Sequence, residues 1–184
     1  MIFLASRSAS TISYNQASKY LADALATLRA KSATALALIT FIENAPAVQI
    51  GIVAAQEPGA FGPFNMEWAF TGPCIIWSPT KKFKCKAADI SGYRPNGSAV
   101  WAKKFDTVYP PEITLIHELG HAKQYIEDTS IFASKTVDGL VTEGSKSIDD
   151  IEADNLKRHE NPVCKEMGLY QRVKYSDFDG FVDV

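Results

Sequence analysis

The chain has 184 residues, 46% of them hydrophobic, and a formal net charge of −2 with acidic and basic residues well mixed. This composition suits a single domain over residues 1–184, with a core at about 14–175, and gives no reason to expect a nucleic acid as partner. The longest apolar runs are far shorter than the ~20 residues that cross a bilayer, so we expect no membrane insertion. No coiled-coil seam is present, and we expect a monomer.

Two helices are predicted near the N-terminus. Residues Ser13 to Ala30 alternate apolar and charged positions with helical spacing, and Ser32 is placed to cap a second helix that runs to Asn44. We expect these helices to form a hairpin over a sheet. The β-branched residues of Ala47–Ala55, which follow the break at Pro46, predict a strand.

The centre of the chain predicts a small mixed or antiparallel sheet. Further strands are expected at Met66–Thr71, Cys74–Ser78 and Ala99–Phe105, the last being the final strand. A loop is expected at Gln56–Asn65, a solvated hairpin or loop at Lys81–Lys86, and a turn at Gly92–Ser98. The strand at Cys74–Ser78 is either an edge to which an extended peptide adds or an ordinary member of the sheet.

His117-Glu118-Leu119-Gly120-His121 is the most informative stretch. On a helix, residues four apart project the same way, so His117 and His121 can bind one Zn²⁺ while Glu118 acts as general base on a metal-bound water. Pro111 at the first turn and an apolar stripe predict a helix within 110–129, and the whole chain has only three histidines. Gly120 suggests close approach of another backbone or a substrate.

A catalytic zinc needs a third protein ligand. A histidine six residues after His121 would complete one common pattern, but that position is Glu127, so we expect an acidic residue from a later helix, predicted over Ser147–Arg158. Glu152 is our first choice. Glu160 is the main alternative, followed by Asp150 and then His159. The segment Thr129–Ser147 between these ligands is expected to be mainly loop and to form a rim or lid of the cleft.

The C-terminal residues add further candidates. Pro162 is expected to open a helix and Gly168 to end it, and Arg172 and Tyr175 lie in the next segment. Tyr175 is a candidate donor to the oxyanion of an attacked peptide, or else a structural hydrogen-bond donor. Cys164 is either a thiol near the site or, as we favour, a buried residue without a role in the reaction.

Three stretches of the chain resemble the NleD-type effector zinc metallopeptidases of bacteria, which are also found as payloads of polymorphic toxins. The stretches are Leu21–Ile42, the motif helix from Pro110 to Ala122, and the C-terminal set Glu160-Asn161, Gly168-Leu169, Arg172 and Tyr175. The resemblance implies an α+β, zincin-like fold with an N-terminal helical hairpin, a small sheet, an active-site helix and C-terminal helices. It also implies a protein substrate in a target cell, with signalling kinases as the precedent.

We therefore expect a zinc endopeptidase in which Glu118 is the general base. Two alternatives stay open, a metal-dependent hydrolase of a non-peptide bond and a zinc-binding interaction module without turnover. The first residues lack the basic leader and apolar core of a signal peptide. A secreted effector or toxin of this kind would therefore reach the target-cell cytoplasm by a non-classical route.

Overall fold

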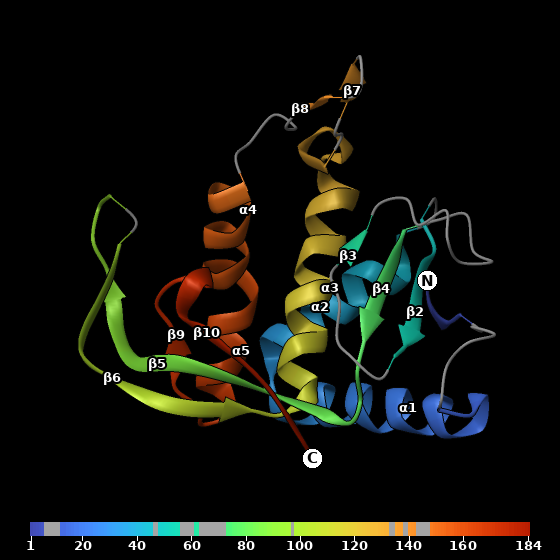
Figure 1. The fold of residues 1–184 in the computed structure, drawn as a ribbon, viewed down its shortest axis with the longest axis horizontal. Coiled ribbons are helices and arrows are strands. Elements are labelled where there is room, and N and C mark those ends of the chain that lie inside the picture. The colour runs from blue at the N-terminus through green and yellow to red at the C-terminus, as the bar shows by residue number, and fades with distance from the viewer. Residues whose placement is uncertain are drawn as a thin grey trace.

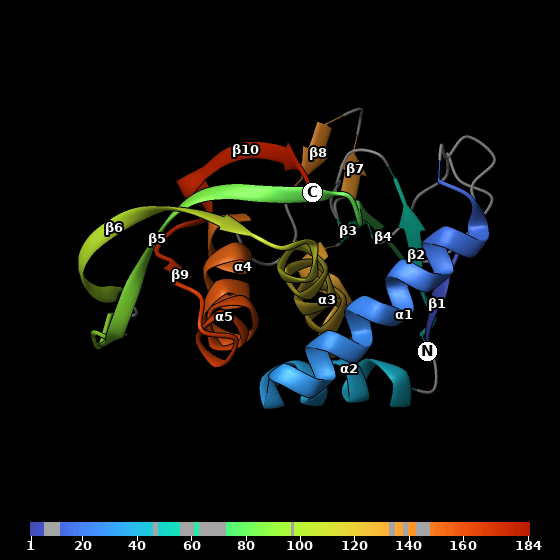
Figure 2. The ribbon, with the colours of Figure 1, turned by 90° about the horizontal axis from the view of Figure 1, so that it is seen from below.

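The computed structural model describes residues 1–5, 12–45, 48–55, 61–62, 73–96, 98–132, 135–137, 140–142 and 148–184. They form a mixed α+β structure, as predicted, in which helix α3 (Pro111–Glu127) is central (Figure 1). Helices α1 and α2 lie on one side of α3 and the C-terminal helices α4 and α5 on the other (Figure 2). None of the helices described has the length and apolar character needed to cross a membrane.

The two predicted N-terminal helices are confirmed as α1 (Tyr14–Lys31) and α2 (Ala33–Asn44). Ser13 caps α1 in a capping box with Gln16. Ser32 ends the first helix and caps the second, because its side chain accepts a hydrogen bond from the backbone N–H of Ala35 at 2.9 Å. One serine therefore makes the sharp reversal of the hairpin.

A mixed sheet lies beside α3 and has the order β1 (Ile2–Leu4), β2 (Ile50–Ala54), β4 (Cys74–Trp77), β3 (Phe61–Gly62). β4 is parallel to β2 and antiparallel to β3. The strand predicted at Cys74–Ser78 therefore has a neighbour on both sides at Cys74 and Ile75. Phe61–Gly62 lies in a predicted loop but is the edge strand instead. The strand predicted at Met66–Thr71 lies outside the described residues.

An antiparallel sheet arches over α3 and the C-terminal helices (Figure 2). It contains β10 (Phe178–Asp183), β5 (Lys81–Tyr93) and β6 (Ala99–Tyr109), and β9 (Gln171–Arg172) also pairs with β5. Of the two structures predicted for Lys81–Lys86, a solvated hairpin or a loop, the loop is wrong, since the segment begins β5, a strand of the β5–β6 hairpin. Phe83 and Cys85 are buried while Lys84 and Lys86 are exposed, which is the alternation of a strand with one solvated face.

Two further predictions in this part of the chain need correction. The strand predicted at Ala99–Phe105 continues to Tyr109 and is not the last one, since the hairpin β7 (Lys135–Val137) and β8 (Leu140–Thr142) comes after it along with β9 and β10. The expected loop after α3 therefore contains this hairpin and a 3-10 turn at Thr129–Phe132. The predicted turn is confined to Arg94–Ser98, because Gly92 and Tyr93 still belong to β5.

The C-terminal helices follow one another without a break. α4 (Ile148–Asn155) runs through a π-helical turn, η2 (Leu156–Glu160), into α5 (Asn161–Glu166), with helical backbone angles at both junctions. The sequence predicts two helices here, because Pro162 is typical of a helix start. The wider π turn before Pro162 accommodates its missing N–H, so the helix continues. Gly168, with a φ of 73°, ends the helix as predicted.

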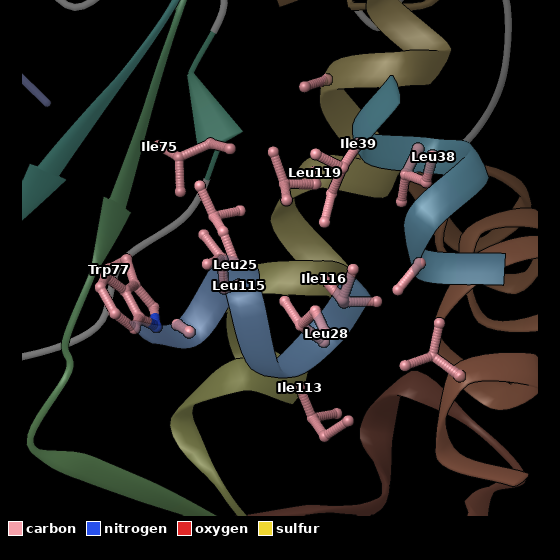
Figure 3. Close-up of a cluster of buried hydrophobic side chains, with 14 of the residues drawn as sticks. Leu25, Leu28, Leu38, Ile39, Ile75, Trp77, Ile113, Leu115, Ile116 and Leu119 are labelled. Carbon is pink, nitrogen blue, oxygen red and sulfur yellow. The ribbon is translucent and has the colours of Figure 1, made fainter. Parts of the chain in front are cut away.

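The core lies where α3 meets α1, α2 and the mixed sheet (Figure 3). Ile113, Leu115, Ile116 and Leu119 of α3 are almost completely buried there, and each contributes roughly 1.5–3 kcal/mol relative to an exposed position. Trp77 of β4 donates a hydrogen bond from its indole N–H to the carbonyl of Pro111 at 2.9 Å. This contact ties the first turn of α3 to the sheet.

Candidate metal centre

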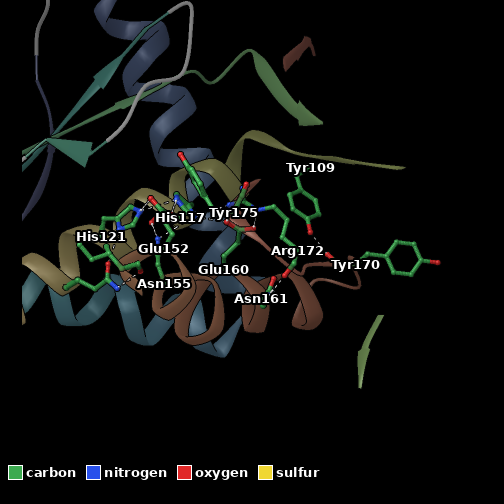
Figure 4. Close-up of polar contacts among 12 residues, drawn as sticks. Tyr109, His117, His121, Glu152, Asn155, Glu160, Asn161, Tyr170, Arg172 and Tyr175 are labelled. Atoms are coloured by element: carbon green, nitrogen blue, oxygen red, sulfur yellow. Dashed lines mark hydrogen bonds and ion pairs between the residues drawn. The ribbon is translucent and has the colours of Figure 1, made fainter. Parts of the chain in front are cut away.

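His117 and His121 of α3 meet Glu152 of α4 between the two helices (Figure 4). The Nε2 atoms of the histidines are 3.1 Å apart. The carboxylate of Glu152 lies across both rings, with Oε2 at 3.2 Å from Nε2 of His117 and Oε1 at 3.3 Å from Nε2 of His121. These three residues form a possible metal-binding triad.

The spacing of these atoms fits a tetrahedral zinc ion. With zinc–ligand bonds of ~2.0–2.2 Å, tetrahedral geometry places neighbouring ligand atoms about 3.3–3.6 Å apart. The two Nε2 atoms are 3.1 Å apart, and each has a different Glu152 oxygen at 3.2 or 3.3 Å, which is near the short end of that range. In addition, Oε2 of Glu152 is buried, and its one neighbour at hydrogen-bond distance among the described residues is Nε2 of His117, which can donate only when that ring nitrogen is protonated. A cation between the three side chains would give this oxygen a partner.

Both histidines are held by their other ring nitrogen. Nδ1 of His117 lies 2.7 Å from Oε2 of Glu160, and Nδ1 of His121 lies 2.9 Å from Oε1 of Gln124. Because both partners are acceptors, each Nδ1 carries the proton, and the Nε2 lone pairs are available to a metal. Gln124 is itself fixed, since it donates to the carbonyl of Ile151 and to Asp154.

Glu160, the main alternative third ligand, has a different position. Arg172 donates from Nε and Nη2 to its two carboxylate oxygens, at 2.7 and 2.5 Å, and Nδ1 of His117 lies 2.7 Å from one of them, Oε2. Burial by itself would raise the pKa of Glu160, but Arg172 and His117 outweigh it and lower the pKa to about 2. Glu160 is therefore an ionised partner of His117 and is not in the triad.

The π turn explains how two glutamates eight residues apart both reach α3. In a regular α-helix eight residues leave an angular offset of ~80°. A π turn closes with i→i+5 hydrogen bonds, as between the N–H of Asn161 and the carbonyl of Leu156, and so rotates less per residue. The smaller rotation brings Glu160 back toward the face that carries Glu152.

The other candidates lie away from the cluster. Asp150 is exposed on α4. His159 is buried but belongs to no metal-binding group among the described residues, and it lies against Gly120. Cys164 is fully buried, and burial raises the pKa of its thiol well above the usual range, so it is a poor nucleophile.

Gly120 is explained by a neighbouring side chain, and the expected approach of a backbone or substrate is not what the structure shows. A Cβ at this position would lie 1.9 Å from Oδ1 of Asn155 on α4. The absence of a side chain lets Asn155 approach α3 and donate from Nδ2 to the carbonyl of His117 at 2.8 Å. Asn155 thus fixes the backbone at His117, a member of the triad.

Without a metal, the carboxylates around His117 favour the protonated form of its ring. Burial would lower the pKa of His117, but hydrogen bonds to Glu152 and Glu160 outweigh it and raise the pKa to about 9. Burial opposes ionisation of Glu152 as well, yet the two histidines lower its pKa to about 2. At pH 7 the triad therefore contains an ionised carboxylate and a protonated imidazole whose proton a metal ion must replace.

A cavity of about 550 Å³ lies next to the triad. His117, Glu118 and Tyr175 line it together with the apolar side chains of Phe83, Ile113, Phe178 and Phe181. The Tyr175 ring stacks on His117 with centroids 5.8 Å apart, and burial raises the pKa of its phenol, which stays protonated at neutral pH. Two predicted catalytic residues, Glu118 and Tyr175, therefore face the same space.

Sequence reasoning missed the supporting residues. Gln124 is three positions after His121 on the same helix and could have been found from that spacing. Asn155 and the pairing of Arg172 with Glu160 have no local signal. The same holds for Phe83, Phe178 and Phe181, which reach the cavity from β5 and β10.

Comparisons with protein-family models, curated proteins and solved structures gave no match to this chain. The resemblance to the effector metallopeptidases therefore stays a prediction from the sequence. The geometry of the triad and of the cavity beside it is the main ground for assigning a function.

Proposed function

We propose that the protein is a zinc-dependent endopeptidase with a single zincin-like domain. The observation that carries this proposal is the triad of His117, His121 and Glu152, whose ligand atoms lie close enough together to hold one metal ion, with Glu118 beside it on a cavity wall. Three protein ligands leave a fourth position open, which is the arrangement of catalytic zinc sites.

Bound zinc would lower the pKa of a coordinated water toward ~7 and polarise the carbonyl of the substrate. Glu118 would take the proton of that water and return it to the leaving amine. Tyr175 is protonated and lines the same cavity, so it can donate a hydrogen bond to the oxygen that becomes negative during attack. Glu160 and Gln124 keep the two histidines oriented.

The lining of the cavity supports a polypeptide substrate. Phe83, Phe178 and Phe181 make an apolar wall within reach of Glu118, which suits an apolar side chain next to the cleaved bond. The proposal that this substrate is a signalling protein, such as a kinase, in a target cell rests on the sequence resemblance alone. Delivery as an effector or toxin payload rests on the same resemblance.

The test compares the wild type with Glu118→Gln after loading with zinc. Both proteins should bind about one zinc per chain by elemental analysis, because Glu118 is not a ligand. Only the wild type should create new N-termini in a denatured protein mixture, as detected by mass spectrometry. Equal cleavage by Glu118→Gln would refute the role of this residue, and a wild type that binds no zinc would refute the metal site.

A further inference from the structure

A second cavity, of about 640 Å³, lies on the other side of the segment Tyr175–Ser176. These two residues line both cavities, so the second one adjoins the space beside the triad. Its walls come from the end of the β5–β6 hairpin, from α4 and η2, and from the residues before Tyr175. We call it the basic cavity because of its charged lining.

Three cations and no acidic residue line the basic cavity. Arg94, Lys157 and Lys174 are exposed, and none of them has an ion-pair partner among the described residues. Other cations nearby do have partners, since Lys104 is 2.5 Å from Asp177 and Arg158 is 3.3 Å from Glu127. In a chain with a net charge of −2, this is a local concentration of uncompensated positive charge.

Aromatic rings form the outer wall of the basic cavity. Tyr93 and Trp101 are large side chains with 38% and 40% of their surface exposed, and Lys157 places its ammonium 5.3 Å from the centroid of the Tyr93 ring. Exposed aromatic residues next to charged ones are typical of sites that bind polypeptides.

Asn161 contributes an acceptor at the same cavity. Its Nδ2 donates to the carbonyl of Arg172 at 2.8 Å and to the hydroxyl of Tyr93 at 3.3 Å. Its Oδ1 is buried and has no hydrogen-bond partner among the described residues. A buried oxygen without a partner costs free energy, and the N–H of a bound peptide would satisfy it.

We infer that the basic cavity is a specificity subsite that binds an aspartate or glutamate side chain of the polypeptide substrate. This inference rests on the proposed function, because it places the acidic residue on one side of the bond that the zinc site cleaves. Arg94, Lys157 and Lys174 supply the charge, Tyr93 and Trp101 contact the apolar part of the substrate, and Asn161 accepts from its backbone.

The first experiment measures binding and does not need turnover. Fluorescence anisotropy compares labelled oligoglutamate with labelled oligoglutamine on zinc-loaded Glu118→Gln. Oligoglutamate should bind about tenfold more tightly, as expected for the gain of two or more exposed ion pairs. Adding Lys157→Glu and Lys174→Glu should abolish this preference. The matched control, Lys31→Glu with Lys165→Glu, makes the same change in net charge at exposed positions outside the cavity and should keep it.

The second experiment uses the wild-type protein on a library of unphosphorylated peptides. Cleaved peptides should be enriched in aspartate or glutamate at one position relative to the new terminus, and the Lys157/Lys174 variant should lose that enrichment while it still cleaves. Equal binding of the two probes, or a preference that survives the double reversal, would overturn the inference. If the wild type cleaves no peptide, the proposed function is contradicted. The anisotropy comparison alone then tests whether the basic cavity binds acidic side chains.

Discussion

Glu152 and Glu160 have different roles, and two substitutions can distinguish them. Glu152 contacts the triad histidines, so Glu152→Ala removes a ligand and should lower zinc affinity by more than the ~10–100-fold that loss of a supporting residue causes. The metal-free fold should lose less stability than in Glu160→Ala, because His117 keeps Glu160 as its counter-ion when Glu152 is removed.

Glu160→Ala should cost more stability and less zinc affinity than Glu152→Ala. The side chains of Glu160 and Arg172 are only 1% and 3% exposed, so the variant leaves a buried guanidinium without its counter-ion. Breaking such a pair costs about 3–5 kcal/mol, a large part of the ~5–15 kcal/mol that stabilises a domain. Zinc affinity should fall by only ~10–100-fold, because His117 loses its orienting partner but the triad is complete.

The assay is urea unfolding of the metal-free proteins in chelator, combined with zinc titration of the same samples. Asp150→Ala serves as control, because Asp150 is exposed on the helix that carries Glu152 and should change stability by less than about 0.5 kcal/mol. The reasoning would be refuted if Glu152→Ala kept full zinc affinity, or if Glu160→Ala lost zinc completely with unchanged stability.

Three further changes test the site. Gly120→Ala should destabilise the protein by about 1–3 kcal/mol in thermal unfolding, since its methyl group would overlap Asn155, and Asn155→Ala in the same chain should remove most of that added cost. Tyr175→Phe should lower kcat by ~10²–10³-fold with unchanged zinc content if its phenol stabilises the oxyanion, and an unchanged kcat would remove it from the mechanism. Because His117 has a pKa of about 9 without metal, zinc must displace its proton, so zinc affinity should rise about tenfold per pH unit from pH 7 toward 9. Calorimetry in buffers of different ionisation enthalpy should detect the released proton. A zinc affinity that does not change with pH would contradict the raised pKa.

The sequence by itself determined those features that depend on neighbouring residues. The helices α1, α2 and α3, and the common face of His117 and His121, result from helical periodicity and capping. Apolar and charged residues also alternate along part of Lys81–Lys86, as in a strand, but its lysines led us to expect a solvated hairpin or loop.

Only the tertiary structure decided between Glu152 and Glu160. Both are acidic residues of the same predicted region, and their roles depend on the pairing of Glu160 with Arg172 and on a π turn that no local pattern announces. The two cavities are likewise assembled from α3, α4, the long hairpin and the C-terminal strand. Such contacts join residues that are far apart along the chain, and their geometry is decided by how the apolar faces of these elements pack together.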